Sequence, residues 1–547
     1  SHVKINSGDA SNAPLIKMSS SGVINSLTHT EFSEINIGGG KTLSITEDFV
    51  VPGDKQLRIT GAEGILSLGG NMTLTGTLSF TDNNSTLDGG NLALNGGILQ
   101  AEDDINLKSN LLQSAESKIV AASGKTINYS GASLSLGANT LRISGGGAFS
   151  NTNSLVLDDA ASKLHLSSIT VGSVSTSVDN SLGVVVENDS TISNFAVSNT
   201  TPVSIASGKT LEGSIGVTAG SLKLTETGTL ASAVSMSGGT TLDADNSLTV
   251  SGTLTHTGDI TIDVLDNKTL SYSGAPLSLG SHTLSILGAG TLSNVSGSPL
   301  VLDQTVSILD LKGSGTVSGA VKLESGTLKS SGSATISGVL TQYSDATIEV
   351  PASQTLSYSG ASLSLGANTL RISGGGAFSN TNSLVLDDAA SKLHLSSITV
   401  GSVSTSVDNS LGVVVENDST ISNFAVSNTT PVSIASGKTL EGSIGVTAGS
   451  LKLTETGTLA SAVSMSGGTT LDADNSLTVS GALTHAGDIT IDVAGTRTLT
   501  YTGAPISLGE HTLKLMGGGS LLSGGLDINN AASKLLLSSI TVDNVST

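Results

Sequence analysis

Cysteine and tryptophan are absent from this sequence of 547 residues. Without cysteine there is neither a disulfide framework nor a thiolate metal site, which excludes a small disulfide-stapled secreted domain. Only 2% of the residues are aromatic, so a thick core of large side chains is excluded as well. Charged residues make up 12%, and the helix formers Glu, Lys, Arg and Gln are scarce. The interior is therefore expected to be narrow and filled by Leu, Val, Ile and Ala.

Basic residues are few relative to acidic ones. The 44 Asp and Glu against 23 Lys and Arg give a net charge of −21, which repels phosphate backbones and anionic lipid surfaces. No apolar run approaches the roughly 18 to 20 residues of a membrane-spanning helix. The first residues, Ser1 to Ala10, do not have the pattern of a signal peptide. We therefore expect neither nucleic-acid binding nor membrane insertion.

What the sequence has in abundance is repetition. The segment from Tyr129 to Val264 occurs again, without insertion or deletion, from Tyr358 to Val493. The two blocks differ at two positions, where Thr253 and Thr257 are replaced by Ala482 and Ala486. Near-identity at a fixed offset indicates an array built from a long super-repeat, so the fold has to be interpreted from its repeating unit.

A finer repeat lies inside the long one. The segment Lys125 to Gly147 recurs as Lys268 to Gly290, Gln354 to Gly376 and Arg497 to Gly519. The offsets between these copies share an approximate divisor of about 20 to 21 residues, which is the size of one β-solenoid coil. Segments such as Ser221 to Thr225 alternate apolar and polar residues between Gly, Asn and Asp, as strands between turns require.

The pattern predicts an all-β parallel β-helix, or β-solenoid, of about 20 to 21 residues per coil. At one inter-strand spacing of roughly 4.8 Å per coil, about 27 coils would form a rod on the order of 130 Å long. We expect residues 1–37 to be an irregular lead-in or diverged coil and residues 38–547 to be one continuous solenoid. Tandem immunoglobulin-like sandwiches are the alternative, although such domains normally carry a large core aromatic residue.

The strands resemble those of giant bacterial surface proteins. Segments such as Leu74 to Leu78 and Leu248 to Leu254 are similar to the Leu, Val, Thr and Gly-rich strands of autotransporter passenger regions and filamentous-haemagglutinin-like adhesins. The resemblance covers roughly Gly38 to Thr547. It implies a right-handed parallel β-helix, an extracellular, cell-surface location and a structural role. It also implies that partners are further repeats of the same long chain, copies of the chain, or a neighbouring cell surface or matrix.

No residue is predicted to be catalytic, to bind a cofactor or to bind a metal ion. Four of the five Tyr occupy the same place in the finer repeat, which indicates packing rather than a ligand platform: Tyr129, Tyr272, Tyr358 and Tyr501. The His of one segment recurs in the second block but is Leu536 in a third related segment. Its position is therefore expected to need a side chain of moderate size rather than an imidazole; the two histidines are His165 and His394.

Acidic clusters are interpreted as solvated turns, because Asp and Asn tolerate turn conformations and bond their own backbone. They are Glu102 to Asp104, Asp158 to Asp159, Asp243 to Asn246 and Asp472 to Asn475. The last two lack the central Gly and closing Glu of a calcium loop. Gly145 to Gly147 and Gly124 to Thr126 contain letters of a phosphate loop but no following helix signal, so turns are expected there. Outward Thr pairs such as Thr73 and Thr75 are not expected to line up once per coil.

These features together predict a non-enzymatic structural region of an extracellular bacterial fibre or adhesin stalk, acting as a rigid spacer or scaffold. A self-assembling extracellular filament or sheath subunit and a carbohydrate-active β-helix enzyme are the alternatives. The last residues, Ile540 to Thr547, correspond to Ile169 to Thr176 in the interior of the repeat. We therefore expect the sequence to be a piece of a longer chain, or its end to dock on another copy.

Overall fold

Parallel strands account for the whole regular structure of the computed structural model, which describes residues 2–5, 15–29, 32–295 and 297–546. The described residues contain no helix. They form a β-solenoid whose two compact units together have about 25 turns. The units are Ser1–Ala275 and Pro276–Thr547. The predicted solenoid class is confirmed, and antiparallel immunoglobulin-like sandwiches are excluded.

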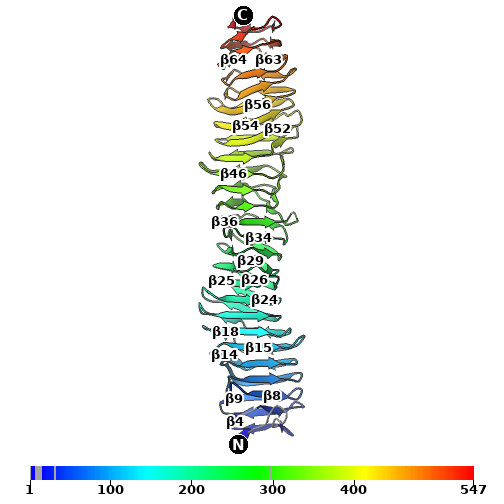
Figure 1. Ribbon diagram of the computed structural model, residues 1–547, viewed down its shortest axis with the longest axis vertical. Helices are drawn as coiled ribbons and strands as arrows, with labels where there is room; N and C mark the ends of the chain where they lie inside the picture. Colours follow the sequence, from blue (N-terminus) through cyan, green and yellow to red (C-terminus); the bar gives the residue numbers. More distant parts are fainter. Residues whose placement is uncertain (1, 6–14, 30–31, 296, 547) are drawn as a thin grey trace. The chain divides into compact units, whose positions relative to one another are not determined.

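In the first unit, one ladder of parallel strands passes through successive coils (Figure 1, blue to green). Its strands are β2 (Leu15–Lys17), β5 (Ser33–Asn36), β8 (Gln56–Thr60), β10 (Thr77–Phe80), β12 (Ile98–Ala101), β15 (Ser117–Ala121), β18 (Thr140–Ser144), β21 (Lys163–Ser167), β23 (Gly183–Val186), β25 (Thr201–Ile205), β27 (Ser221–Leu224), β30 (Thr241–Ala244) and β33 (Ile260–Val264). A second ladder includes β16 (Thr126–Tyr129), β19 (Ala148–Asn151), β22 (Thr170–Thr176), β24 (Ser190–Val197) and β26 (Thr210–Val217).

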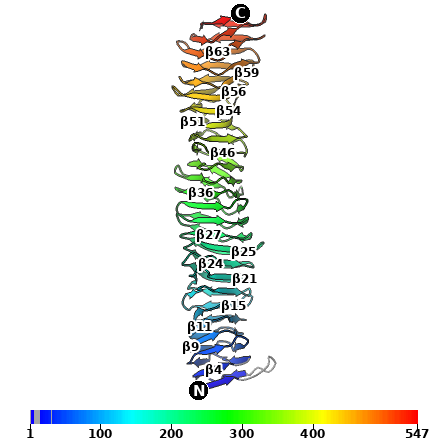
Figure 2. The ribbon, with the colours of Figure 1, turned by 60° about the vertical axis from the view of Figure 1, so that its left-hand side comes forward.

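The second unit repeats this arrangement, and Figure 2 shows its strands stacked from β36 to β63. Its first ladder contains β36 (Thr283–Gly288), β39 (Ile308–Leu311), β42 (Thr327–Lys329), β45 (Ala346–Glu349), β48 (Thr369–Ser373), β51 (Lys392–Ser396), β53 (Gly412–Val415), β55 (Thr430–Ile434), β57 (Ser450–Leu453), β60 (Thr470–Ala473), β63 (Ile489–Val493), β66 (Thr512–Met516) and β69 (Lys534–Ser538). The second ladder includes β46 (Thr355–Tyr358), β49 (Ala377–Asn380), β52 (Thr399–Thr405), β54 (Ser419–Val426), β56 (Thr439–Val446), β58 (Thr458–Leu459), β61 (Leu477–Val479) and β64 (Thr498–Tyr501).

The coils are close to the predicted length but unequal. Ile143 pairs with Leu166, Leu166 with Val186, and Val186 with Ile205. The sequence separation between paired residues, which we call the step, therefore becomes shorter from each pair to the next. In the second unit, the step from Thr283 to its partner Ile308 is longer than all three. Extra residues enter the turns while the strands stay in register, so the inward side chains remain stacked.

The core is a set of apolar columns, because alternate strand residues point inward and meet their equivalents one coil away. Along one column of the first unit no side chain is more than 1% exposed; its members are Leu141, Leu164, Val184, Val203, Leu224, Ala244 and Val264. Complete burial of one Leu or Val side chain contributes about 1.5–3 kcal/mol. Each coil therefore depends on both neighbours to cover its interior.

The expected lead-in, residues 1–37, lies partly outside the described residues, which omit 1, 6–14 and 30–31. Within it, β2 pairs in parallel with β5, and β5 pairs with β8 of the first ladder. A separate parallel pair joins β1 (His2–Ile5) to β4 (Ser26–His29).

Leu164→Ala is expected to weaken the coils next to β21, since an apolar cavity at this position costs about 2–5 kcal/mol. Hydrogen exchange with mass spectrometry checks this, because peptides covering β23 and β53 have identical sequences. Loss of protection in the first block alone should split the isotope pattern of this shared peptide into two populations. The exposed Thr170→Ala variant should leave one protected population, and a single population in Leu164→Ala would contradict the stacking account.

Candidate functional site

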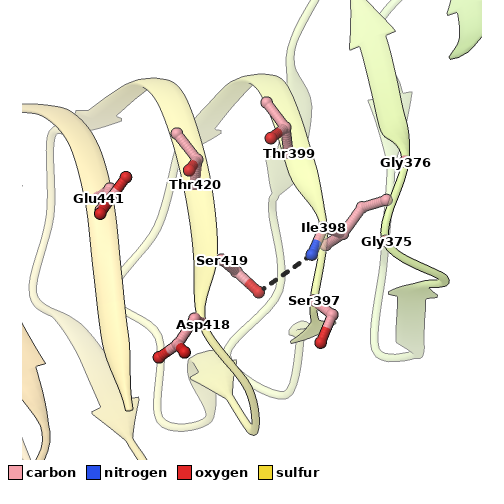
Figure 3. A pocket seen from close by; sticks show the side chains of 9 residues that line it. All are labelled: Gly375, Gly376, Ser397, Ile398, Thr399, Asp418, Ser419, Thr420 and Glu441. Carbon is pink, nitrogen blue, oxygen red and sulfur yellow. Dashed lines mark hydrogen bonds between the residues drawn. The ribbon is translucent and has the colours of Figure 1, made fainter. Parts of the chain in front are cut away.

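Two equivalent polar hollows, one in each unit, have volumes of about 310 and 290 Å³. Their linings occupy corresponding positions of the two near-identical blocks, residues 129–264 and 358–493. In the second unit the hollow is lined by Gly375, Gly376, Ser397, Ile398, Thr399, Asp418, Ser419, Thr420 and Glu441 (Figure 3). We refer to these two depressions as the polar hollows.

A tight turn forms one edge of each polar hollow. Gly375 and Ser397 have left-handed φ angles of 86° and 54°, and the Gly375 amide donates to the Ser397 carbonyl at 2.6 Å. A Cβ atom on Gly376 would lie 2.4 Å from the Pro351 carbonyl oxygen. A side chain at that position would clash with the backbone of the preceding coil, so the turn requires glycine there.

The wall of the hollow is the outer face of the second ladder. Thr399, Thr420 and Glu441 occupy matching positions on β52, β54 and β56, and Figure 3 shows their side chains on adjacent strands. Ser419 Oγ accepts a hydrogen bond from the Ile398 amide at 3.4 Å. Asp418 Oδ1 accepts one from the Thr439 amide at 2.8 Å, so this carboxylate is partly engaged in holding the next coil.

The chemistry available in the polar hollow is hydrogen bonding. Its lining contains hydroxyl groups, two carboxylates and backbone, but no imidazole, amine, thiol or aromatic ring. A nucleophile hydrogen-bonded to a base is therefore absent from this lining. A third hollow of about 260 Å³ in the second unit is also lined largely by Thr, Ser and Asp, with Arg371 added. Such hollows recur on the outer face.

The four repeated tyrosines are structural, as predicted. Tyr129 is 2% exposed, and its ring stacks on Phe149 with centroids 5.6 Å apart. Its hydroxyl donates to the Ala132 carbonyl at 2.5 Å and accepts from the Leu111 amide, one coil away, at 3.2 Å. The other three make the same two bonds: Tyr272 to Ala275 and Leu254, Tyr358 to Ala361 and Leu340, and Tyr501 to Ala504 and Leu483. Burial raises the pKa of all four hydroxyls.

The repeated histidines do more than fill space, which corrects the prediction of a size requirement alone. His394 Nε2 lies 3.0 Å from Glu416 Oε1, and Glu416 Oε2 accepts from Arg371 Nη1 at 2.8 Å. In the first unit, His165 itself lies between the two charged groups, with Arg142 at its Nδ1 atom and Glu187 at its Nε2 atom. Burial lowers the pKa of both imidazoles. Leu536, at the third equivalent position, is 52% exposed.

The acids from Asp243 to Asn246 are not simply solvated turn residues. Asp243 lies within strand β30, which corrects that part of the prediction. Lys223, one coil earlier, has its Nζ atom 3.1 Å from Asp243 Oδ2 and 2.8 Å from Asp245 Oδ2. In the second unit Lys452 makes the equivalent contacts with Asp472 and Asp474.

Acids at turns tie neighbouring coils together. Asp104 Oδ1 accepts from the Thr126 amide at 2.7 Å, and Asp103 Oδ1 is 2.6 Å from Lys125 Nζ. Asp158 accepts from the Gly137 amide at 2.9 Å. Gly124, Gly145 and Gly146 have left-handed φ angles of 70°, 121° and 82°, which agrees with turns rather than a phosphate loop. Among the described residues no group of three or more His, Cys, Asp or Glu is placed to hold a metal ion.

The sequence prediction missed regular columns of hydroxyl side chains. Thr73 pairs with Ala93 and Val50, as expected for an irregular pattern. Elsewhere threonines do align once per coil, as in the column of Thr439, Thr458, Thr478 and Thr500 on β56, β58, β61 and β64. The spacing between successive members of this column is unequal, which hides the alignment from any search at one fixed period.

No protein family matches the chain, and no curated protein or solved structure matches it. Of the residues that the structure describes, none form a helix long and apolar enough to cross a membrane.

Tyr129→Phe is expected to keep the ring packed on Phe149 while leaving the buried Leu111 amide without its acceptor. An unsatisfied buried amide costs about 1–3 kcal/mol, so the midpoint of thermal or urea unfolding should fall. Circular dichroism measures it, with the exposed Thr170→Ala variant as control. An unchanged midpoint would show that the hydroxyl contributes nothing to coil stacking.

Asp263→Asn is expected to stabilise the protein at pH 7. Burial raises the pKa of Asp263, and the neighbouring charges of Asp243 and Asp245 raise it further. A raised folded-state pKa means that the charged form is disfavoured on folding. The destabilisation of the folded state by the Asp263 carboxylate is absent below the pKa of the unfolded chain, about 3.9. It is complete once the pH exceeds the raised pKa of the folded state.

The unfolding midpoint of Asp263→Asn should therefore exceed that of the parent chain at pH 7 and approach it near pH 3. Glu226→Gln, at an exposed position, removes the same net charge and should have little effect at either pH. A lower midpoint at pH 7 would contradict the assigned direction.

Proposed function

We propose that the chain is a structural spacer in an extracellular bacterial fibre or adhesin stalk at the cell surface. The observation that carries the proposal is the structural equivalence of the two near-identical blocks, residues 129–264 and 358–493. In both units the same strands pair in the same register, as in Arg142 with His165 and Arg371 with His394. A duplicated segment therefore adds coils without requiring a new core.

The chemistry of the side chains supports the same proposal. The repeated Tyr, Asp, Lys and His side chains make contacts between coils, as described above for Tyr129, Asp104, Lys223 and His165. The polar hollows offer hydrogen-bonding groups without a nucleophile and base pair. Length is thus the property that the repeat adjusts.

Removal of one super-repeat, residues 129–357, tests the proposal. The deletion joins Asn128 to Tyr358, so Asn128 is again followed by a copy of the same near-identical block. A loss of about eleven coils should shorten the maximum dimension by roughly 50 Å in solution X-ray scattering. The unfolding midpoint should change little, since each remaining coil keeps equivalent neighbours. A shortened chain of unchanged dimension, or one that fails to fold, would contradict the spacer account.

Two controls separate the alternatives. A filament subunit would lengthen with protein concentration in the same scattering experiment, whereas a spacer would not. A carbohydrate-active enzyme would cleave members of a polysaccharide panel, and its activity would fall when the acids of the polar hollows are changed in the Asp189→Asn, Asp418→Asn double variant. Turnover of that kind would overturn the spacer proposal.

A further inference from the structure

Two imidazoles from adjacent coils face each other in the second unit. His485 ends strand β62 (Leu483–His485), and His511 directly precedes β66. Their ring centroids are 5.7 Å apart and the ring planes meet at 66°. The pair lies away from the polar hollows and takes no part in the spacer contacts described above.

The bonding of His485 fixes which ring nitrogen is free. Its Nδ1 atom lies 2.9 Å from the Gly487 carbonyl oxygen. A carbonyl oxygen can only accept, so Nδ1 carries the hydrogen and Nε2 of the neutral ring carries a lone pair. Nε2 is buried and has no hydrogen-bond partner among the residues that the structure describes. A buried acceptor of this kind is unfavourable unless something binds it.

The same two positions carry a different pair elsewhere in this unit. Gln342 and Asn368 precede His485 and His511 by the same offset that separates the last two copies of the finer repeat. Gln342 Nε2 donates to the Ser344 and Thr369 carbonyls at 3.0 and 2.9 Å, and Asn368 Nδ2 donates to the Leu365 carbonyl at 3.0 Å. The two amide nitrogens therefore serve the backbone, whereas Gln342 Oε1, like His485 Nε2, is buried without a hydrogen-bond partner among the described residues.

The first unit contains the amide pair as well. Gln113 Nε2 donates to the Ala115 and Thr140 carbonyls at 3.3 and 2.8 Å, and Asn139 Nδ2 donates to the Leu136 carbonyl at 3.1 Å. Sequence repeats thus contain Gln with Asn or His with His at these positions. The remaining histidine pair in the sequence is His256 and His282.

The backbone around both kinds of pair is held alike. Asp488 Oδ1 accepts from the Thr512 amide at 2.6 Å, and Asp345 Oδ1 accepts from the Thr369 amide at 2.7 Å. These bonds fix the start of the following strand relative to the preceding turn. The exchange of amides for imidazoles is therefore a change of chemistry on an unchanged frame.

We propose that His485 and His511 bind a divalent transition-metal ion such as Cu²⁺, Ni²⁺ or Zn²⁺. Two ring nitrogens that each lie about 2.0–2.1 Å from one ion place their ring centroids roughly 5–6 Å apart. A carbonyl that receives the Nδ1–H group is the usual orienting partner of a metal-binding imidazole. Water completes the coordination, and the ion links two successive coils.

Binding of each metal chloride to the full-length chain is measured by calorimetry, and Cu²⁺ is also followed by electron paramagnetic resonance. His256→Gln and His282→Asn are introduced first, so that one histidine pair remains. The matched variant adds His485→Gln and His511→Asn, a pair that the chain already uses at Gln342 and Asn368. Circular dichroism verifies that both proteins fold, and the other histidines are common to both.

The protein with His485 and His511 should bind about one Cu²⁺ ion with an affinity at least about tenfold higher than that of the matched variant. The electron paramagnetic resonance spectrum of this ion should show two nitrogen ligands. Affinity should fall in the order Cu²⁺, Ni²⁺, Co²⁺, and Zn²⁺ should raise the unfolding midpoint of that protein alone. Equal binding by both proteins, or no two-nitrogen Cu²⁺ signal in either, would overturn the proposal. Because this test is independent of rod length, its failure leaves the spacer proposal intact.

Discussion

Parallel pairing of each strand with its equivalent one coil away is the constraint on which everything else in the structure depends. A coil of about 20 residues cannot enclose its own Leu, Val and Ile side chains, so burial is achieved only between neighbours. This makes register the critical property: a slip of one residue would turn the inward column outward. The buried tyrosine hydroxyls and the turn acids act on that constraint, because they bond the backbone of the adjacent coil.

The repeated polar side chains are explained by the same requirement. Tyr129 bridges to Leu111, Asp104 bonds to Thr126, and Lys223 reaches Asp243, each across one coil. In a globular enzyme such groups would converge on one pocket. In this chain they are spread over successive coils, and the near-identical blocks reproduce them. That distribution is one of the observations on which the proposed spacer role rests.

Much of the fold could be predicted from the sequence, because the alternation and the internal offsets directly reflect strand period and coil size. The structural role of Tyr129 and its three equivalents followed from their repeated position. The placement of Asp243 in a strand and the contacts of His165 could not be predicted, since both depend on which residue of the preceding coil lies alongside. The threonine column at Thr439 and the facing pair His485 and His511 were missed for the same reason. Unequal coil lengths set those neighbours, and no single period reveals them.

The central claim is that each coil is stabilised by its immediate neighbours rather than by one common core. Pulling a single molecule by its ends in an optical trap tests this most directly. The account predicts unfolding in small steps of one or a few coils, where each coil of about 20 residues releases roughly 60–70 Å of chain. A single step that released a whole unit of the chain would contradict it.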